Sequence, residues 1–223
     1  MSVNWQEIWE ELKSVLSGKT IDALIPPIVF VITNSLFGLV VGVTSALVLA
    51  GILATVRLIR KQSWGYALGG MLGVGLAAGL ALLTREAASY FIPAMISSGL
   101  FVLAALISNL IGKPLAAWVS HLTRGWPLAW FWRGDVKPAY SEVTWLWGVF
   151  FALRLGLQVF LFLEGEAGTL AWANTLLGWP VTIVVLVASY IYGIWRLQKL
   201  GGPGVGEFEG EKEPPWEGQK RGF

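Results

Sequence analysis

The sequence contains no cysteine and a single histidine, His121. The absence of cysteine excludes disulfide bonds, thiol catalysis and cysteine-ligated metal sites. One histidine argues against a histidine-based metal centre, because such centres combine several nitrogen, sulfur or carboxylate ligands. We therefore predict neither a bound metal nor a cofactor.

Charged residues are scarce. Lys and Arg number 16, Asp and Glu number 14, and together they make up 13% of the chain. Soluble domains contain about 25% charged residues, so this composition points to lipid rather than water as the main solvent. The formal net charge of +2 is small and the basic residues form no single block, which argues against a nucleic-acid partner.

Motifs of common enzyme classes are absent from the sequence. It has no HExxH, no nucleophile elbow and no P-loop. His121 stands near Thr123 and Arg124 without a carboxylate pattern, and a general base needs an orienting partner within hydrogen-bond reach. We predict no catalytic residues and no enzymatic activity. Residues 1–20 also lack the pattern of a secretory signal peptide.

Long apolar stretches occupy most of the chain, which is 55% hydrophobic. About 20 apolar residues in a helix cross a hydrocarbon core of ~30 Å. Six stretches are expected to do so, namely 23–37, 39–58, 64–83, 93–111, 143–163 and 170–195. The first is expected to begin at Pro26-Pro27, and Gly178-Trp179-Pro180 to kink the last or mark its start. The predicted fold is an all-α polytopic membrane protein whose residues 21–200 form a six-helix transmembrane domain.

The distribution of basic residues predicts the orientation of this domain. With six spans, every Lys and Arg outside the spans except Arg85 falls on one side of the membrane. Basic residues gather on the cytoplasmic side, so both termini are predicted to be cytoplasmic. Five of the 13 tryptophans lie beside the ends of apolar stretches, where indoles prefer the headgroup layer. They are Trp64, Trp118, Trp145, Trp172 and Trp195.

Three segments outside the spans differ in character. Residues 1–20 contain an amphipathic helix at 3–17, which either lies in the membrane interface or packs on a partner protein. Residues 113–139 are predicted to form a cytoplasmic interfacial elbow with a second amphipathic helix, whose apolar positions are Leu115, Trp118, Val119 and Leu122. Residues 201–223 are rich in Gly, Pro, Glu and Lys, and are predicted to be a disordered tail.

Arg154 lies near the middle of the fifth predicted span, and no other charged residue lies so deep in a span. An arginine there costs at least ~2.5 kcal/mol on insertion scales, so a compensating environment is required. Helical spacing places Thr144, Trp147, Phe151, Arg154 and Gln158 on one stripe. Glu142 and Glu164 are ~18 Å and ~15 Å away along the helix, too far for an ion pair.

Three environments could compensate the charge of Arg154. Its N–H groups could donate to carbonyls and amides, such as Asn34 or Asn174. It could line a water-filled cavity. It could also bind an anion such as a lipid phosphate, for which the planar guanidinium is well shaped. The hypothetical anion site consists of Arg154, Gln158 and Asn34.

Two further sets of residues suggest contacts. Gly65, Gly69, Gly73 and Ala77 place a small residue at every fourth position, a pattern that favours close helix packing over a ligand groove. Arg57 and Arg60 are typical of topology and lipid-headgroup contacts at the cytoplasmic interface. Alternatively, they form an interfacial phosphate site together with Lys113.

Several landmarks carry a resemblance to a known family. They are Asp22 with Pro26 and Pro27, Arg57, Gly112-Lys113-Pro114-Leu115, and the stretch WLWGVFF that begins at Trp145. Over about residues 21–197 the chain resembles the bacterial inner-membrane septation protein A family, and more closely a sister family catalogued as a domain of unknown function. The resemblance assigns Lys113, Pro114, Trp147 and Phe151 to the shared pattern. It implies a bacterial inner-membrane protein linked to envelope upkeep and division, without enzymatic activity.

Two classes of function follow from these features. The first is a non-enzymatic scaffold in envelope maintenance or septation, which contacts other envelope membrane proteins or a second copy of itself within the lipid bilayer. The alternative is a small transporter or lipid-handling protein with an anion site at Arg154. A polar cavity that reaches Arg154 would favour the alternative, and a dry guanidinium capped by carbonyl groups would favour the scaffold.

Overall fold

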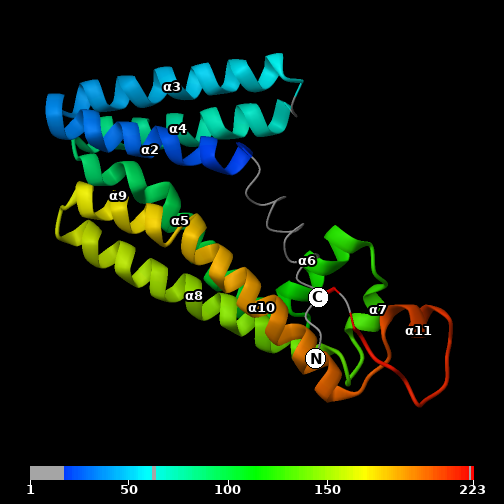
Figure 1. The fold of residues 1–223 in the computed structure, drawn as a ribbon. Coiled ribbons are helices and arrows are strands. Elements are labelled where there is room, and N and C mark those ends of the chain that lie inside the picture. Colours follow the sequence, from blue (N-terminus) through cyan, green and yellow to red (C-terminus); the bar gives the residue numbers. More distant parts are fainter. Residues whose placement is uncertain (1–17, 62–63, 221) are drawn as a thin grey trace. The chain divides into compact units, whose positions relative to one another are not determined.

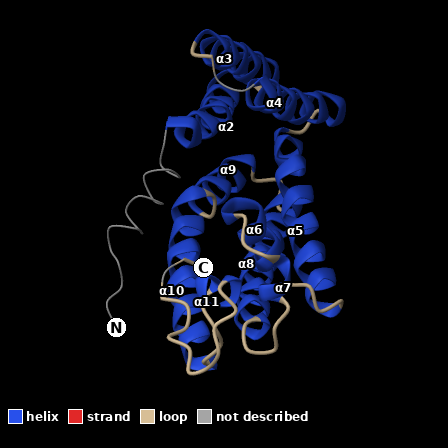
Figure 2. Cartoon of the chain, turned by 90° about the vertical axis from the view of Figure 1, so that its right-hand side faces the viewer, coloured by secondary structure: helices blue, strands red, loops and turns tan. Residues whose placement is uncertain are grey.

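The computed structural model describes residues 18–61, 64–220 and 222–223. These residues form helices and loops, with no β-strand among them (Figure 2). The predicted amphipathic helix at 3–17 lies outside the described residues. Contacts divide the chain into two units. Unit 1 contains Ser98–Leu153 and Thr182–Phe223, and unit 2 contains the described residues up to Ser97 together with Arg154–Val181.

The long helices follow the predicted apolar stretches closely (Figure 1). They are α2 (Gly18–Phe37), α3 (Leu39–Ile59), α4 (Trp64–Thr84), α5 (Ile92–Leu110), α8 (Lys137–Leu163) and α10 (Trp179–Leu200). Shorter elements join them, namely the 3₁₀ helix η1 (Ala87–Phe91), α6 (Leu115–Arg124), α7 (Leu128–Phe131), α9 (Ala167–Leu176) and α11 (Val205–Glu209).

Four helical segments of the described chain are long and apolar enough to cross a membrane. They are Leu39–Ile59, Ala87–Leu110, Lys137–Leu163 and Ala167–Leu200. The described apolar parts of the other two predicted spans, Ile25–Phe37 and Leu68–Thr84, are shorter. The chain is therefore an all-helical, multi-pass membrane protein, and the count of six spans stays a prediction.

The surfaces of these helices are apolar. Large hydrophobic side chains are widely exposed, such as Leu72 at 66%, Leu83 at 84% and Leu153 at 72%. A soluble monomer rarely exposes so much contiguous apolar surface, whereas lipid contact requires it. The five tryptophans expected at the headgroup layer, Trp64, Trp118, Trp145, Trp172 and Trp195, are all exposed.

Of two expected helix boundaries, one comes out differently and the other agrees with the prediction. Pro26 and Pro27 lie inside α2 rather than in its first turn, because the helix already begins at Gly18. Membrane helices tolerate interior prolines where neighbouring groups satisfy the freed carbonyls. The predicted break at 178–180 separates α9 from α10. A Cβ on Gly178 would stand 2.6 Å from the carbonyl oxygen of Asn174, so this turn requires glycine.

Unit 2 is held together by small residues and one aromatic cluster. Helices α2, α3 and α4 lie side by side (Figure 1). Six alanines of α3 and α4 are buried, namely Ala46, Ala50, Ala54, Ala77, Ala78 and Ala81. Phe30 of α2 stacks on Tyr90 of η1, with ring centroids 4.0 Å apart, and Phe91 meets both rings edge-on. This cluster fixes the position of η1 against α2.

The close approach of α2 and α3 gives a direct test of this packing. A Cβ on Gly42 would stand 2.9 Å from the Cβ of Asn34 and 3.1 Å from the carbonyl oxygen of Phe30. We expect Gly42→Ala to lower the free energy of unfolding by about 1–3 kcal/mol through overpacking. Thermal unfolding in detergent measures the effect. The matched control is Gly51→Ala on the same helix, where nothing lies within 4 Å; equal effects of the two variants would contradict the packing.

In unit 1, residues of the predicted elbow (113–139) contribute to a compact aromatic core. Its buried residues include Trp130, Phe131, Val136 and Tyr140, and Leu197 of α10 packs against them. The predicted apolar face of α6 does not join this core. Instead α6 buries Ala117 and Ser120, while Trp118, Val119 and Leu122 are exposed, because a small-residue face lets α6 approach its neighbours closely. The interfacial position of this apolar face stays a prediction.

The C-terminal residues differ most from expectation. Composition predicts disorder after residue 200, yet the described residues of this segment pack on the elbow. The indole N–H of Trp130 donates to the Pro203 carbonyl (2.8 Å), and Phe223 stacks on Tyr140 with centroids 4.3 Å apart. Arg133 forms a two-bond ion pair with Asp135 (2.7 and 2.9 Å) and lies 5.2 Å from the Trp216 ring. Contacts with a few buried aromatic residues thus hold this segment in place despite its polar composition.

Glu207 fixes the loop of this C-terminal segment. Its hydrogen bonds allow us to predict how the stability of the segment depends on pH. Its carboxylate accepts backbone hydrogen bonds from Gly204, Glu217 and Gly218 at 2.8–3.1 Å. These bonds favour the charged form and hold the pKa of Glu207 below its ordinary value of 4.5.

A lowered pKa means that the unfolded segment binds the proton more tightly than the folded one. The stabilisation is therefore fully present above pH 4.5 and is lost as the pH falls through the folded pKa. We expect hydrogen exchange of the 204–218 amides to accelerate over that window. The Glu207→Gln variant should exchange faster at neutral pH and lose the pH dependence. Exchange that is insensitive to both changes would contradict the role of Glu207.

Candidate functional site

The stripe predicted on the fifth span runs along α8. In unit 1, Thr144 is buried and accepts a hydrogen bond from the backbone N–H of Ala116 (3.1 Å), Trp147 donates to Ser189 (3.3 Å), and Phe151 stacks on Phe101. In unit 2 the stripe continues with Arg154 and Gln158. Arg154 stands nine residues before the end of α8 at Leu163, which is ~13 Å at 1.5 Å per residue.

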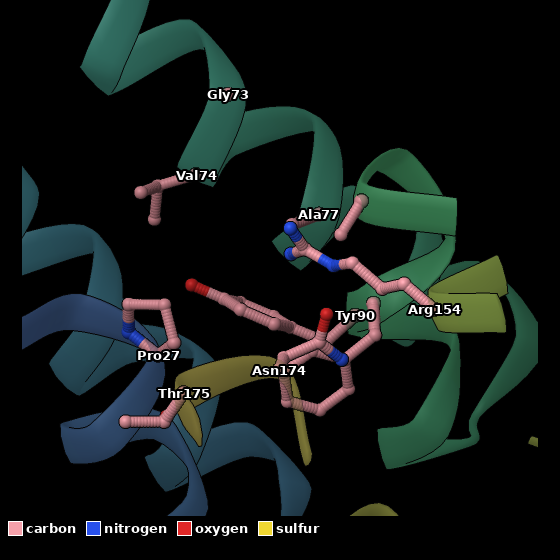
Figure 3. Close-up of a pocket in the computed structure, with 10 residues that line it drawn as sticks. Pro27, Gly73, Val74, Ala77, Tyr90, Arg154, Asn174 and Thr175 are labelled. Carbon is pink, nitrogen blue, oxygen red and sulfur yellow. The ribbon is translucent and has the colours of Figure 1, made fainter. Parts of the chain in front are cut away.

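Arg154 lines a pocket within unit 2 that has a volume of about 240 Å³ (Figure 3). Each neighbouring element contributes to its wall. The lining residues are Pro27 of α2, Gly73, Val74 and Ala77 of α4, Tyr90 and Phe91 of η1, Ala94 of α5, Arg154 of α8, and Asn174 and Thr175 of α9. A cavity is one of the three environments that the sequence left open for Arg154.

Two polar groups of this pocket have no partner. The Nε of Arg154 and the hydroxyl of Tyr90 are buried and make no hydrogen bond to any described residue. Figure 3 shows the guanidinium of Arg154 directed toward Ala77 and the hydroxyl of Tyr90 directed between Val74 and Pro27. A buried donor without a partner costs about 1–3 kcal/mol, more when it is charged. Such groups are usually satisfied by something else, here a ligand or water.

The remaining polar side chains of the pocket are tied to the protein. Gln158, which is fully buried but is not a lining residue, donates from Nε2 to Oδ1 of Asn174 (2.6 Å), while its own Oε1 has no partner among the described residues. Asn174 donates from Nδ2 to the Leu170 carbonyl (2.9 Å). Thr175 donates to the Ala171 carbonyl (2.9 Å). This chain of bonds fixes Asn174 at the wall of the pocket.

The electrostatic character of the pocket is one-sided. Of its lining residues, Arg154 alone is charged, and none is Asp or Glu. Two groups that line the space can donate hydrogen bonds, namely the Arg154 guanidinium and the Tyr90 hydroxyl. A positively charged, donor-rich cavity with apolar walls is suited to an anion.

The structure brings together two of the three residues predicted for the anion site. Arg154 lines the pocket, and Gln158 supports it through Asn174. Asn34 is not a lining residue; it lies against Gly42 at the contact of α2 and α3. The sequence indicated Asn174 only as one possible partner of Arg154. It missed Tyr90, because η1 falls in a short connection that carries no periodic pattern.

The residues predicted for an interfacial phosphate site belong to different units, and their common site stays a prediction. Arg57 is buried, with its Nη1 only 2.9 Å from where a Cβ on Gly70 would stand. Arg60 is exposed at the end of α3. Lys113 is also exposed but belongs to unit 1, whereas the two arginines belong to unit 2.

The predicted glycine ladder of α4 faces open space. A Cβ on Gly65, Gly69 or Gly73 would meet nothing within 4 Å. Within unit 2, α4 instead packs through Ala77, Ala78 and Ala81, while Gly73 also borders the pocket. Among the described residues, no three His, Cys, Asp or Glu side chains gather where they could hold a metal ion.

Comparison with models of protein families gives a match. The profile of a family described as protein of unknown function (DUF3159) matches residues 17–198. This range includes every residue of the pocket. No curated protein and no solved structure matches the chain.

Proposed function

We propose that this chain, which belongs to the DUF3159 family of proteins of unknown function, is a membrane protein that binds an anionic amphiphile at Arg154. The bilayer would supply the ligand, and the protein would hold or move it as a lipid-handling protein or small transporter. No catalytic step is part of the proposal, and neither is a cofactor.

One observation carries this proposal. The guanidinium Nε of Arg154 and the hydroxyl of Tyr90 are buried without a described partner, and both residues line the same pocket. A guanidinium that is only structural would be capped by carbonyl or amide oxygens. Here no described oxygen accepts from the Nε, although a cavity of about 240 Å³ lies beside it. An anion would satisfy these donors and offset the cost of a charge at that depth.

The ligand carried through purification tests the proposal. The wild type and Arg154→Leu would be extracted from the same membranes into polymer discs, and the retained lipids quantified by mass spectrometry. We expect one anionic species to be enriched in the wild type and depleted about tenfold or more in the variant, since hydrogen bonds to charged groups contribute about 1.5–3 kcal/mol. Lys212→Gln, a change at an exposed cation of the C-terminal segment, serves as the control. Identical lipid profiles would contradict the proposal.

The topology proposed for the protein is the six-span map with both termini in the cytoplasm of a bacterium. The excess of Lys and Arg on one side of that map supports it. The inner membrane and a link to envelope maintenance or septation rest on the resemblance of the sequence to the septation protein A family. The exposed apolar face of α6, with Trp118, Val119 and Leu122, fits a position in the cytoplasmic interface.

A scaffold is the second candidate function, and the open glycine face of α4 favours it. Gly65, Gly69 and Gly73 would let a helix of an envelope protein, or of a second copy, approach closely. Replacing Gly69 by Leu would then abolish cross-links along α4 while lipid retention at Arg154 stays unchanged. Cross-links that survive this change would count against the scaffold.

A further inference from the structure

The charge and the donors of the Arg154 pocket specify more than an anion. Resting on the function proposed above, we infer that the ligand is an amphiphile with a singly charged oxyanion group, a phosphodiester or a carboxylate. Its oxygens accept hydrogen bonds from the guanidinium of Arg154 and from the hydroxyl of Tyr90. Tyr90 is thereby a ligand-binding residue.

The single positive charge of the pocket indicates that the ligand carries a single negative charge. Arg154 is the one ionised side chain among the residues that line the pocket, and no lining residue is acidic. An anion of charge −1 neutralises it, whereas a dianion leaves an unbalanced charge in surroundings of low polarity, which is strongly unfavourable. Arg57 of α3 stands against Gly70, one turn of α4 before Gly73, and does not line the pocket.

The position of Tyr90 supports its role as a donor. Its side chain is 4% exposed, and its hydroxyl has no partner among the described residues. The ring is stacked on Phe30 at an interplanar angle of 9° and meets Phe91 edge-on. These contacts hold the ring in place, so the hydroxyl is directed into the pocket rather than free to turn toward another acceptor (Figure 3). A hydroxyl held without a partner is preorganised for an anionic oxygen.

The walls of the pocket indicate an amphiphile rather than a free ion. Val74, Ala77 and Phe91 form an apolar lining beside the polar groups. On the neighbouring turns of α4, Leu72 and Leu76 are about two-thirds exposed and offer an apolar surface for a chain. A volume of about 240 Å³ is below the ~300–1,000 Å³ of sites that enclose a drug-sized molecule. The pocket therefore holds a charged group, and the hydrocarbon part extends along the helices.

A binding series with defined ligands tests this inference on the full-length protein in detergent. The probes are dioleoyl phosphatidylglycerol and oleate as single charges, dioleoyl phosphatidic acid at pH 8.5 as a near-dianion, phosphatidylcholine as a zwitterion, and soluble glycerophosphoglycerol as a headgroup without chains. Half-saturating concentrations are read from native mass spectrometry, with wild type, Tyr90→Phe, Arg154→Gln and Arg154→Lys. Tyr90→Phe keeps the stacked ring and removes only the hydroxyl.

We expect phosphatidylglycerol or oleate to bind at least tenfold more tightly than phosphatidic acid, phosphatidylcholine or the soluble headgroup. Whichever of the two binds better identifies the oxyanion. Tyr90→Phe should weaken that binding roughly tenfold, and Arg154→Gln should abolish it, with partial rescue by Arg154→Lys. Tighter binding of the dianion or of the soluble headgroup, or an unaffected Tyr90→Phe, would overturn the inference while leaving an anion site at Arg154. If no anion binds in an Arg154-dependent way, the proposed function fails with it.

Discussion

Arg154→Leu is expected to make the ligand-free protein more stable than the wild type. The substitution removes a charge whose Nε has no described partner and replaces it with a shorter, apolar side chain. An arginine at the centre of a span costs about 2.5–3.5 kcal/mol on insertion scales, so the free energy of unfolding should rise by up to that amount. The same variant should lose all stabilisation by an added anionic amphiphile. Thermal unfolding in zwitterionic detergent, with and without phosphatidylglycerol, measures both effects.

The two effects together distinguish a ligand-binding role of Arg154 from a purely structural one. A residue whose role is to bind a ligand lowers the stability of the ligand-free protein, whereas a structural residue raises it. Gln158→Leu is the matched control on the same helix, because it removes the fully buried partner of Asn174. That variant should be less stable than the wild type by about 1–3 kcal/mol. If Arg154→Leu instead destabilises the empty protein, the guanidinium is solvated by the protein itself and the pocket holds no anion.

Trp130→Ala is expected to be among the most destabilising single substitutions in unit 1. Trp130 is completely buried, packs on Phe131 and Tyr140, and donates to the Pro203 carbonyl. Loss of a buried tryptophan side chain costs about 3–5 kcal/mol. Because the indole also holds the start of the C-terminal segment, residues 201–220 should become accessible to protease. Limited proteolysis, followed by mass spectrometry of the released fragments, reports this change.

Trp130→Phe separates packing from hydrogen bonding. It keeps an aromatic ring in the core and removes the N–H donor to Pro203. We expect it to lie between the wild type and Trp130→Ala in both unfolding temperature and rate of cleavage. If Trp130→Ala leaves the cleavage of residues 201–220 unchanged, the C-terminal segment is held independently of the elbow.

The helices were predictable because lipid imposes a simple pattern on the sequence. A hydrocarbon core excludes unpaired backbone groups, so each apolar stretch must be helical, and its length follows from the thickness of the core. The predicted 39–58 and 64–83 thus correspond to Leu39–Ile59 and Trp64–Thr84. The 3₁₀ helix η1 was not predicted, since five residues carry no helical period.

Arg154 was predictable for a similar reason, because an isolated charge in an apolar stretch stands out from the sequence. Its neighbours were not, since they come from helices far apart in the chain. Tyr90 and Thr175 meet Arg154 only through the tertiary packing of unit 2, and Asn34, which has the right chemistry, lies elsewhere. The C-terminal segment shows the same limit. Its polar composition suggested disorder, but the aromatic contacts of Trp130, Tyr140 and Phe223 are made across the sequence.

An experimental density map of the protein in a lipid disc would test the central claim most directly. The account predicts density for a charged group within hydrogen-bond distance of both the Arg154 guanidinium and the Tyr90 hydroxyl, with a hydrocarbon chain leading away along α4. A guanidinium turned toward acyl chains, or one capped by protein carbonyls with no other density beside Tyr90, would contradict it.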